Sequence, residues 1–162
     1  MTLVLLRGLR LTLVCLAFVA TVTEAADWGG IAPGTSTKDT VQKIFGAPSR
    51  TEQKKLEGYD VSDWVYEGPR APGGVVRMTI EFGLLAGQNF KPDIVRVLRL
   101  DPAPGVFNRR AIIAGWGIPY AAGREEQTPE FYYEEGLLVL FDKQGWNVER
   151  LVFTPPQPRQ KP

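Results

Sequence analysis

The chain has 162 residues, of which 44% are hydrophobic and 23% are charged, and its formal net charge is +1. This balance gives no basic field for nucleic acid, so no nucleic-acid partner is expected. There is no histidine and only one cysteine, Cys15, which excludes Ser-His-Asp catalysis and zinc sites built from several histidine or cysteine ligands.

Residues 1–25 have the pattern of a secretory signal peptide: two arginines, an uncharged and mostly apolar run at 11–23, and Ala25 at a cleavage point. We therefore expect an exported protein that is cleaved after Ala25 and has no disulfide. An uncleaved N-terminal anchor is the alternative interpretation. Val14 precedes Cys15 where a lipidation signal carries a small residue, so no lipid anchor is expected.

Two helices are expected to end in the same aromatic-Gly-x-Pro sequence, at residues 45–48 and 116–119. Glycine can adopt the left-handed conformation just past a helix, and proline stops the helix from continuing. Thr35 or Ser36 is the expected cap of the first helix, and Asn108 caps the second. Apolar residues follow each cap at the spacing of a helix that buries one face.

Each helix is followed by apolar and alternating segments that predict three strands. The predicted strands span residues 62–68, 75–82, 93–100, 129–136, 137–145 and 146–153. The chain therefore divides into two units, residues 27–103 and 104–154. A proline-rich tail at 155–162 is expected to be extended or disordered.

The sequence also resembles a known family. Gly-Thr-Ser at 34–36, Phe-Gly-Ala-Pro at 45–48 and Asp-Trp-Val-Tyr at 63–66 resemble the signature of the SmpA/OmlA domain of BamE-like envelope proteins. The resemblance covers residues 31–100 well and 106–153 more loosely. Two such units in tandem also resemble the architecture of the β-lactamase inhibitory protein.

This resemblance implies an α+β fold of tandem BamE-like units, each a helix packed on a three-stranded antiparallel sheet. It also implies a periplasmic or outer-membrane-associated location in the bacterial cell envelope. The resemblance to BamE implies a role in outer-membrane assembly or maintenance. The tandem arrangement implies instead an inhibitor of a secreted or periplasmic enzyme.

The residues that remain for chemistry are carboxylates, hydroxyls and lysines, and no catalytic, cofactor-binding or metal-binding residue is expected. Glu134 and Glu135 are adjacent on a predicted strand and so point to opposite faces. A carboxylate-dependent hydrolase is the least favoured alternative. It requires two members of one group of carboxylates to converge in a deep pocket: Glu81, Glu134, Asp142 and Glu149.

Aromatic residues are the stronger candidates for function, because tryptophan and tyrosine supply large and rigid contact areas at protein interfaces. The sequence predicts a non-enzymatic protein-binding module whose partner is another envelope protein. The alternative is that most of these aromatic residues form the core. The candidate binding residues are Trp64, Tyr66, Arg77, Tyr132, Tyr133 and Trp146.

Overall fold

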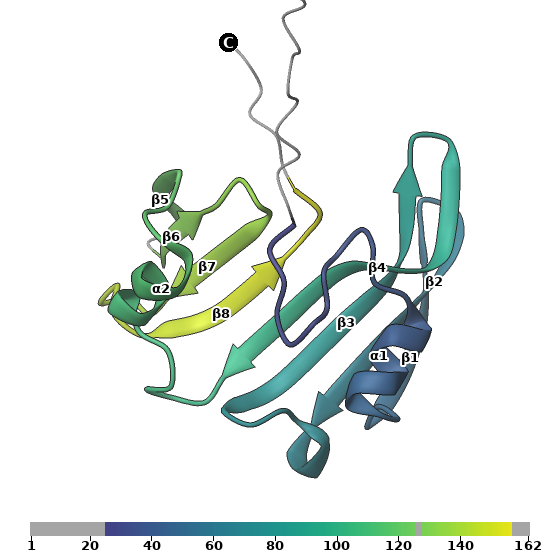
Figure 1. Cartoon of the computed structure of the whole chain (residues 1–162), viewed down its shortest axis with the longest axis horizontal. Coiled ribbons are helices and arrows are strands. Elements are labelled where there is room, and N and C mark those ends of the chain that lie inside the picture. Colours follow the sequence, from purple (N-terminus) through teal and green to yellow (C-terminus); the bar gives the residue numbers. More distant parts are fainter. Residues whose placement is uncertain (1–24, 126–127, 157–162) are drawn as a thin grey trace, which may run out of the picture.

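The computed structural model describes residues 25–125 and 128–156. Its strands form one eight-stranded antiparallel sheet in the spatial order β1-β2-β3-β4-β8-β7-β6-β5 (Figure 1). Two eight-residue α-helices lie on the same side of this sheet. Because the strand numbers rise inward from both edges, each half of the chain builds one half of the sheet.

Both halves of the chain have the order helix, strand, strand, strand, strand. The first half consists of α1 (Lys38–Phe45), β1 (Arg50–Leu56), β2 (Tyr59–Glu67), a short 3-10 helix η1 (Gly68–Arg70), β3 (Val75–Ala86) and β4 (Asn89–Pro102). The second half consists of α2 (Arg109–Trp116), β5 (Ala121–Glu125), β6 (Thr128–Tyr132), β7 (Leu137–Phe141) and β8 (Val148–Phe153). The halves meet where β4 pairs with β8, with Leu98 opposite Phe153 and Leu100 opposite Leu151.

The two helices begin with the same kind of side-chain cap. The Thr37 hydroxyl accepts a hydrogen bond from the Thr40 N–H at 3.2 Å, and the Asn108 side-chain oxygen accepts one from the Ala111 N–H at 3.0 Å. Each cap satisfies an amide group that the helix itself leaves free. The expected cap at Asn108 is confirmed, and the first cap lies one residue beyond Ser36.

The two helices also end in the same way, as the repeated aromatic-Gly-x-Pro sequence predicts. Gly46 and Gly117 follow the last turns with φ angles of 71° and 80°, a region that favours glycine. The Tyr66 hydroxyl, from β2, donates to the Gly46 carbonyl at 3.0 Å, and the Tyr133 hydroxyl donates to the Gly117 carbonyl at 3.1 Å. We call this pair of contacts the helix–sheet junctions.

The hydrophobic core lies between the sheet and the layer formed by the helices and residues 25–37. That N-terminal segment buries Ile31 completely, and Trp28 stacks on Phe45 of α1 with ring centroids 6.1 Å apart. The largest fully buried side chains are Tyr66, Phe82, Phe141, Phe153, Ile31, Met78, Ile80, Leu98, Leu100, Ile112, Leu137 and Leu151. All of them lie within residues 26–162, so the exported form expected from the sequence contains this core.

The expected α+β fold of tandem helix-on-three-strand units is wrong. The molecule is dominated by strands: β1 and β5 add a fourth strand to each half, and the β4–β8 pairing joins both halves into one sheet. Both additional strands lie at the edges of the sheet, and every residue of β1 is exposed. Edge strands without a buried face carry no apolar alternation, which is why the sequence pattern missed them.

The expected boundary between residues 103 and 104 falls between β4 and α2, and the sheet continues across both units. The predicted signal peptide at 1–25 lies outside the described residues except for Ala25. The predicted proline-rich tail at 155–162 is described only as far as residue 156.

Candidate functional site

The face of the sheet opposite the helices is the candidate site, and we call it the open face. Directly paired residues of an antiparallel sheet point to the same side, so the strand register assigns side chains to this face. Those of β1 to β4 are mostly charged, whereas β7 adds leucines. The open face includes Arg50, Glu52, Lys54, Val61, Asp63, Val65, Glu67, Arg77, Thr79, Glu81, Val97, Arg99, Asp101, Glu130, Tyr132, Leu138, Leu140, Arg150 and Val152.

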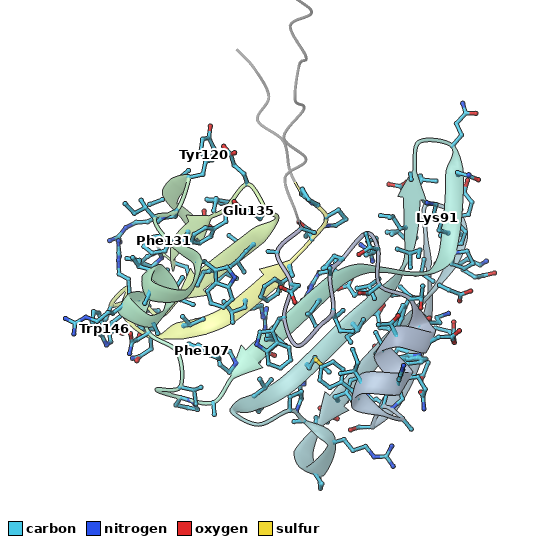
Figure 2. The ribbon with its side chains drawn as sticks, in the orientation of Figure 1. Lys91, Phe107, Tyr120, Phe131, Glu135 and Trp146 are labelled. Atoms are coloured by element: carbon cyan, nitrogen blue, oxygen red, sulfur yellow. The ribbon has the colours of Figure 1, made fainter. Side chains whose placement is uncertain are left out.

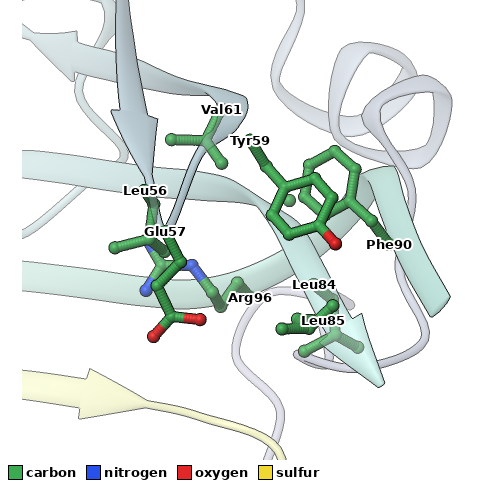
Figure 3. A pocket seen from close by; sticks show the side chains of 9 residues that line it. Leu56, Glu57, Tyr59, Val61, Leu84, Leu85, Phe90 and Arg96 are labelled. Carbon is green, nitrogen blue, oxygen red and sulfur yellow. The ribbon is translucent and has the colours of Figure 1, made fainter. Parts of the chain in front are cut away.

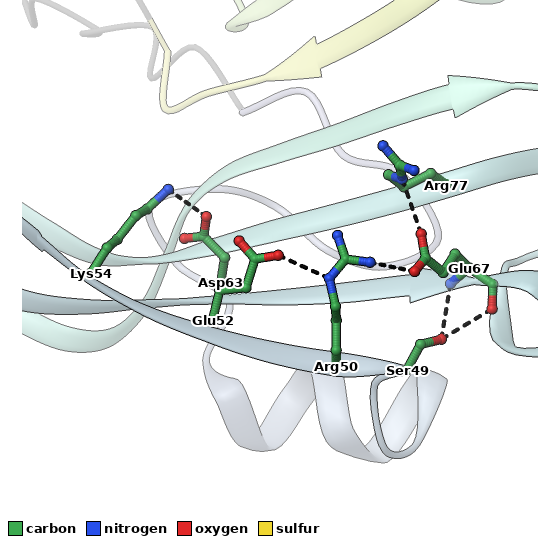
Figure 4. A network of polar contacts seen from close by, with 7 residues as sticks. All are labelled: Ser49, Arg50, Glu52, Lys54, Asp63, Glu67 and Arg77. Atoms are coloured by element: carbon green, nitrogen blue, oxygen red, sulfur yellow. Dashed lines mark hydrogen bonds and ion pairs between the residues drawn. The ribbon is translucent and has the colours of Figure 1, made fainter.

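Charged side chains on the open face pair across neighbouring strands (Figure 4). Glu67 on β2 accepts hydrogen bonds from Arg50 on β1 and from Arg77 on β3, the latter at 3.1 Å. The hydrogen bond from Arg50 lowers the pKa of the Glu67 carboxyl, and Arg77 adds to this effect. Lys54 pairs with Asp63, whose side chain is only 6% exposed. The pairs hold this part of the face in a defined charge pattern.

Glu81 on β3 is, like Asp63, an almost fully enclosed charge of the open face. Its side chain is 6% exposed and lies between two guanidinium groups, with Arg96 Nη2 at 2.6 Å and Arg99 Nη2 at 2.9 Å. A buried carboxylate is costly unless it is paired, and two arginines satisfy both of its oxygens. The three side chains together leave one positive charge in excess.

A pocket of about 390 Å³ opens on this face where the β1–β2 and β3–β4 hairpins meet, and we call it the hairpin pocket. Figure 3 shows Leu56, Glu57 and Arg96 on one side and the stacked rings of Tyr59 and Phe90 on the other. Those two ring centroids are 4.4 Å apart. The residues that line the pocket are Leu56, Glu57, Tyr59, Val61, Gly83, Leu84, Leu85, Phe90 and Arg96.

Gly83 lets the strands approach closely behind the pocket. Its φ angle is 99°, and the β3–β4 register shifts on both sides of Phe82. A Cβ atom at Gly83 would lie 2.6 Å from Val61 Cγ1 and 3.3 Å from the Phe90 ring. No other residue fits this backbone and this space, so the pocket depends on a glycine at the bulge.

Half of the predicted binding residues lie on the helix side of the sheet. Tyr66 and Tyr133 are buried and make the helix–sheet junctions. Burial raises the pKa of Tyr66 to about 12 and also raises that of Tyr133. Trp64 is partly buried, and its ring lies edge-on to Phe82 at 5.0 Å between centroids. These three side chains form the core, as the alternative interpretation expected, and are not available to a partner.

The other three predicted residues are exposed but do not lie together. Arg77 and Tyr132 are on the open face, in different halves of the sheet. Trp146 is 48% exposed and lies beside α2, where it shares a shallow surface with Arg110 and Ile113. Figure 2 shows that Trp146 lies at the end of the molecule opposite the β3–β4 hairpin, which carries Lys91. The structure therefore does not assemble the predicted patch.

Two of the four carboxylates named for the hydrolase alternative, Glu81 and Asp142, are held in separate contacts. Glu81 is bound by two arginines on the open face. Asp142 closes the turn after β7, where the Trp146 N–H donates to it at 2.9 Å and lowers its pKa. Within residues 25–125 and 128–156, no three His, Cys, Asp or Glu side chains are grouped so as to hold a metal ion. The hairpin pocket contains a single carboxylate, that of Glu57.

The hairpin pocket was not predicted from the sequence. Four of its apolar residues come from segments 50–58 and 83–92, which look like a polar stretch and a loop, and two more, Tyr59 and Val61, come from the start of β2. One available signal was Glu57-Gly58 between Leu56 and Tyr59, since a two-residue turn ending in glycine between such residues favours a hairpin. The alignment of two hairpins on one face depends on strand register, which no local pattern reports.

Comparisons with known proteins give no family for this chain. No protein-family model matches it, and no curated protein matches its sequence. One similar solved structure is a DUF4309 family protein, YjgB, from Bacillus subtilis, with 10% identity, a TM-score of 0.42 and coverage of 78% of this chain and 82% of that one. Another is an extracellular protein with an SCP domain from Bacillus anthracis, with 10% identity and a TM-score of 0.46; the match covers 85% of this chain and 50% of that one.

The expected membership of the SmpA/OmlA family is therefore wrong. No protein-family model matches the chain, and one continuous sheet replaces the tandem units that the resemblance implied. The motifs behind the expectation are helix ends and strand residues, and these are structural in this molecule: Gly46 ends α1 and Tyr66 anchors it. In the part of the chain that the structure describes, no helix is long and apolar enough to cross a membrane.

Proposed function

We propose that this is an exported, non-catalytic module that binds another protein through the open face of its sheet. One observation carries the proposal: the helices and residues 25–37 cover one face of the sheet, while the other displays ordered charges beside an apolar pocket. Paired charges of fixed position give orientation and specificity, and exposed apolar side chains give contact area. The signal-peptide pattern of residues 1–25 supports export.

The test is capture of envelope proteins by the chain of residues 26–162, compared with a charge-reversed variant of the open face. Arg77→Glu combined with Arg150→Glu changes two half-exposed side chains on this face, outside the hairpin pocket. We expect a specific partner to be retained by the unmodified protein and lost by the variant. Circular dichroism of both proteins verifies that the variant is folded.

The matched control is Lys43→Glu combined with Arg110→Glu, which makes the same change of charge on the exposed surfaces of α1 and α2. The control should capture the partner as well as the unmodified protein does. Loss of the partner with the control alone would assign binding to the helix side and contradict the proposal. If the partner is an enzyme that loses activity when bound, the inhibitor alternative becomes the specific function of the face.

A further inference from the structure

The hairpin pocket combines an apolar wall with a cation. Tyr59 and Leu85 are 38% and 40% exposed where they line the pocket, and Phe90 stacks on Tyr59. The volume of about 390 Å³ is near the lower end for ligand pockets in proteins. The space therefore suits a small apolar group about the size of one aromatic side chain.

Arg96 supplies the cation and retains unused hydrogen-bonding capacity. Its Nη2 donates to Glu81, and its Nε is buried and has no acceptor among the described residues. Because Arg99 also binds Glu81, the carboxylate neutralises only one of the two guanidinium groups. The side chain of Arg96 is 24% exposed and borders the pocket. An anion in the pocket would form charge-assisted hydrogen bonds with this guanidinium group.

We propose that the hairpin pocket binds a carboxylate attached to an aromatic or branched apolar group, with the carboxylate at Arg96 and the apolar group against Tyr59, Phe90 and Leu85. The ligand comes from one of two sources, a free small acid or the C-terminal residue of a polypeptide. The proposal goes beyond the proposed function, because the pocket would take this ligand whether or not the rest of the open face binds a protein.

Glu57 sets a limit on this affinity. It lies in the β1–β2 turn with a φ angle of 50°, is exposed, and borders the pocket on the same side as Arg96. Its negative charge opposes a carboxylate ligand but would not affect a neutral one. Replacement of Glu57 by glutamine therefore tests the sign of the ligand's charge without touching Arg96.

The test uses four probes: 3-phenylpropionate, its amide, the peptide acetyl-Ala-Ala-Phe with a free carboxylate, and the same peptide amidated. Each is titrated into the 26–162 chain, and binding is followed by amide NMR shifts. We expect saturable shifts near Leu56, Phe90 and Arg96 with both acids, and about tenfold weaker binding of both amides. Tighter binding of the peptide acid identifies a polypeptide C-terminus as the source, and tighter binding of 3-phenylpropionate identifies a free acid.

Arg96→Gln and Arg99→Gln form a matched pair, because each removes one of the two guanidinium groups on Glu81 but only Arg96 borders the pocket. Arg96→Gln should weaken acid binding about tenfold, and Arg99→Gln, which removes the excess positive charge but not the guanidinium group that borders the pocket, should weaken it by no more than about threefold. Glu57→Gln should strengthen it about twofold. If Arg96→Gln does not fold, the change in acid binding by Glu57→Gln still shows whether the pocket recognises a negatively charged ligand.

Equal binding of acids and amides would overturn the proposal, as would equal losses in the two arginine variants, weaker acid binding by Glu57→Gln, or no saturable shift at the pocket. These results do not depend on any protein partner. Failure here therefore leaves the capture experiment valid, and failure of the capture experiment leaves the pocket proposal standing.

Discussion

The two halves of this molecule share their helix–sheet junctions and differ at the ends of their strands. In both, a tyrosine hydroxyl donates to the carbonyl of the glycine that ends the helix, from Tyr66 on β2 to Gly46 and from Tyr133, just after β6, to Gly117. In the first half β3 and β4 have twelve and fourteen residues, whereas β7 and β8 have five and six. The additional length of β3 and β4 contributes Leu84, Leu85 and Phe90 to the hairpin pocket. The elements that both halves share therefore form the sheet, and the extension of β3 and β4 beyond them forms the candidate ligand pocket.

The largest effect is expected where the halves join. Phe153 on β8 is fully buried, pairs with Leu98 of the first half and lies opposite Leu137 of the second. Phe153→Ala should reduce the free energy of unfolding by about 3–5 kcal/mol, because it leaves a cavity in the shared core. Urea unfolding followed by amide NMR signals from each half measures this, and both halves should unfold together.

Val152→Ala is the control for that comparison, since Val152 is next to Phe153 but lies on the open face and is only partly buried. It should cost less than half as much. Loss of the second-half signals at a clearly lower urea concentration than the first-half signals would show that the halves are separate units, contrary to a shared core.

A smaller effect is expected at the helix–sheet junctions. Tyr66→Phe and Tyr133→Phe each remove one hydroxyl and leave a glycine carbonyl without its donor. Each should reduce the free energy of unfolding by about 1–2 kcal/mol. Similar values for both variants in urea unfolding would support equivalent junctions. Tyr59→Phe, at an exposed position of the hairpin pocket, should change stability by less than about 0.5 kcal/mol.

The smallest effect is visible only in alkaline solution. Burial raises the pKa of Tyr66 to about 12, whereas an unfolded tyrosine has a pKa of about 10. Between these values the unfolded chain binds fewer protons, so stability is intact below pH 10 and falls as the pH rises through about 12. An absorbance titration of tyrosinate should show a late step that is smaller in Tyr66→Phe, where Tyr133 is the remaining buried tyrosine with a raised pKa. Ionisation of all tyrosines near pH 10 in the folded protein would contradict this.

Local signals in the sequence were sufficient for the helices and for the strands with a buried face. The aromatic-Gly-x-Pro sequences predicted the ends of α1 and α2, and apolar alternation predicted β3. The edge strands β1 and β5 were missed, because a strand that buries neither face has no reason to alternate. The error in fold class follows from these two strands and from the unpredicted pairing of β4 with β8.

The site was less predictable than the fold. Arg77 and Tyr132 do lie on the open face, but Tyr66 and Tyr133 are buried in the core, where each hydroxyl donates to a glycine carbonyl at a helix end. The hairpin pocket depends on a glycine at a bulge and on the alignment of two hairpins. Such features arise from contacts between segments far apart in the chain, and a single sequence does not report them.

The position of β8 has a consequence for how the protein is made. This strand is the last of the eight in the chain, yet it lies at the centre of the sheet, where it pairs with β4 on one side and β7 on the other. Until β8 is available, the apolar residues Leu98 and Leu100 lie on an unpaired strand edge, which is prone to aggregate. The sheet can therefore close only after β8 has been synthesised, and a chaperone that shields β4 during that interval would raise the yield of folded protein.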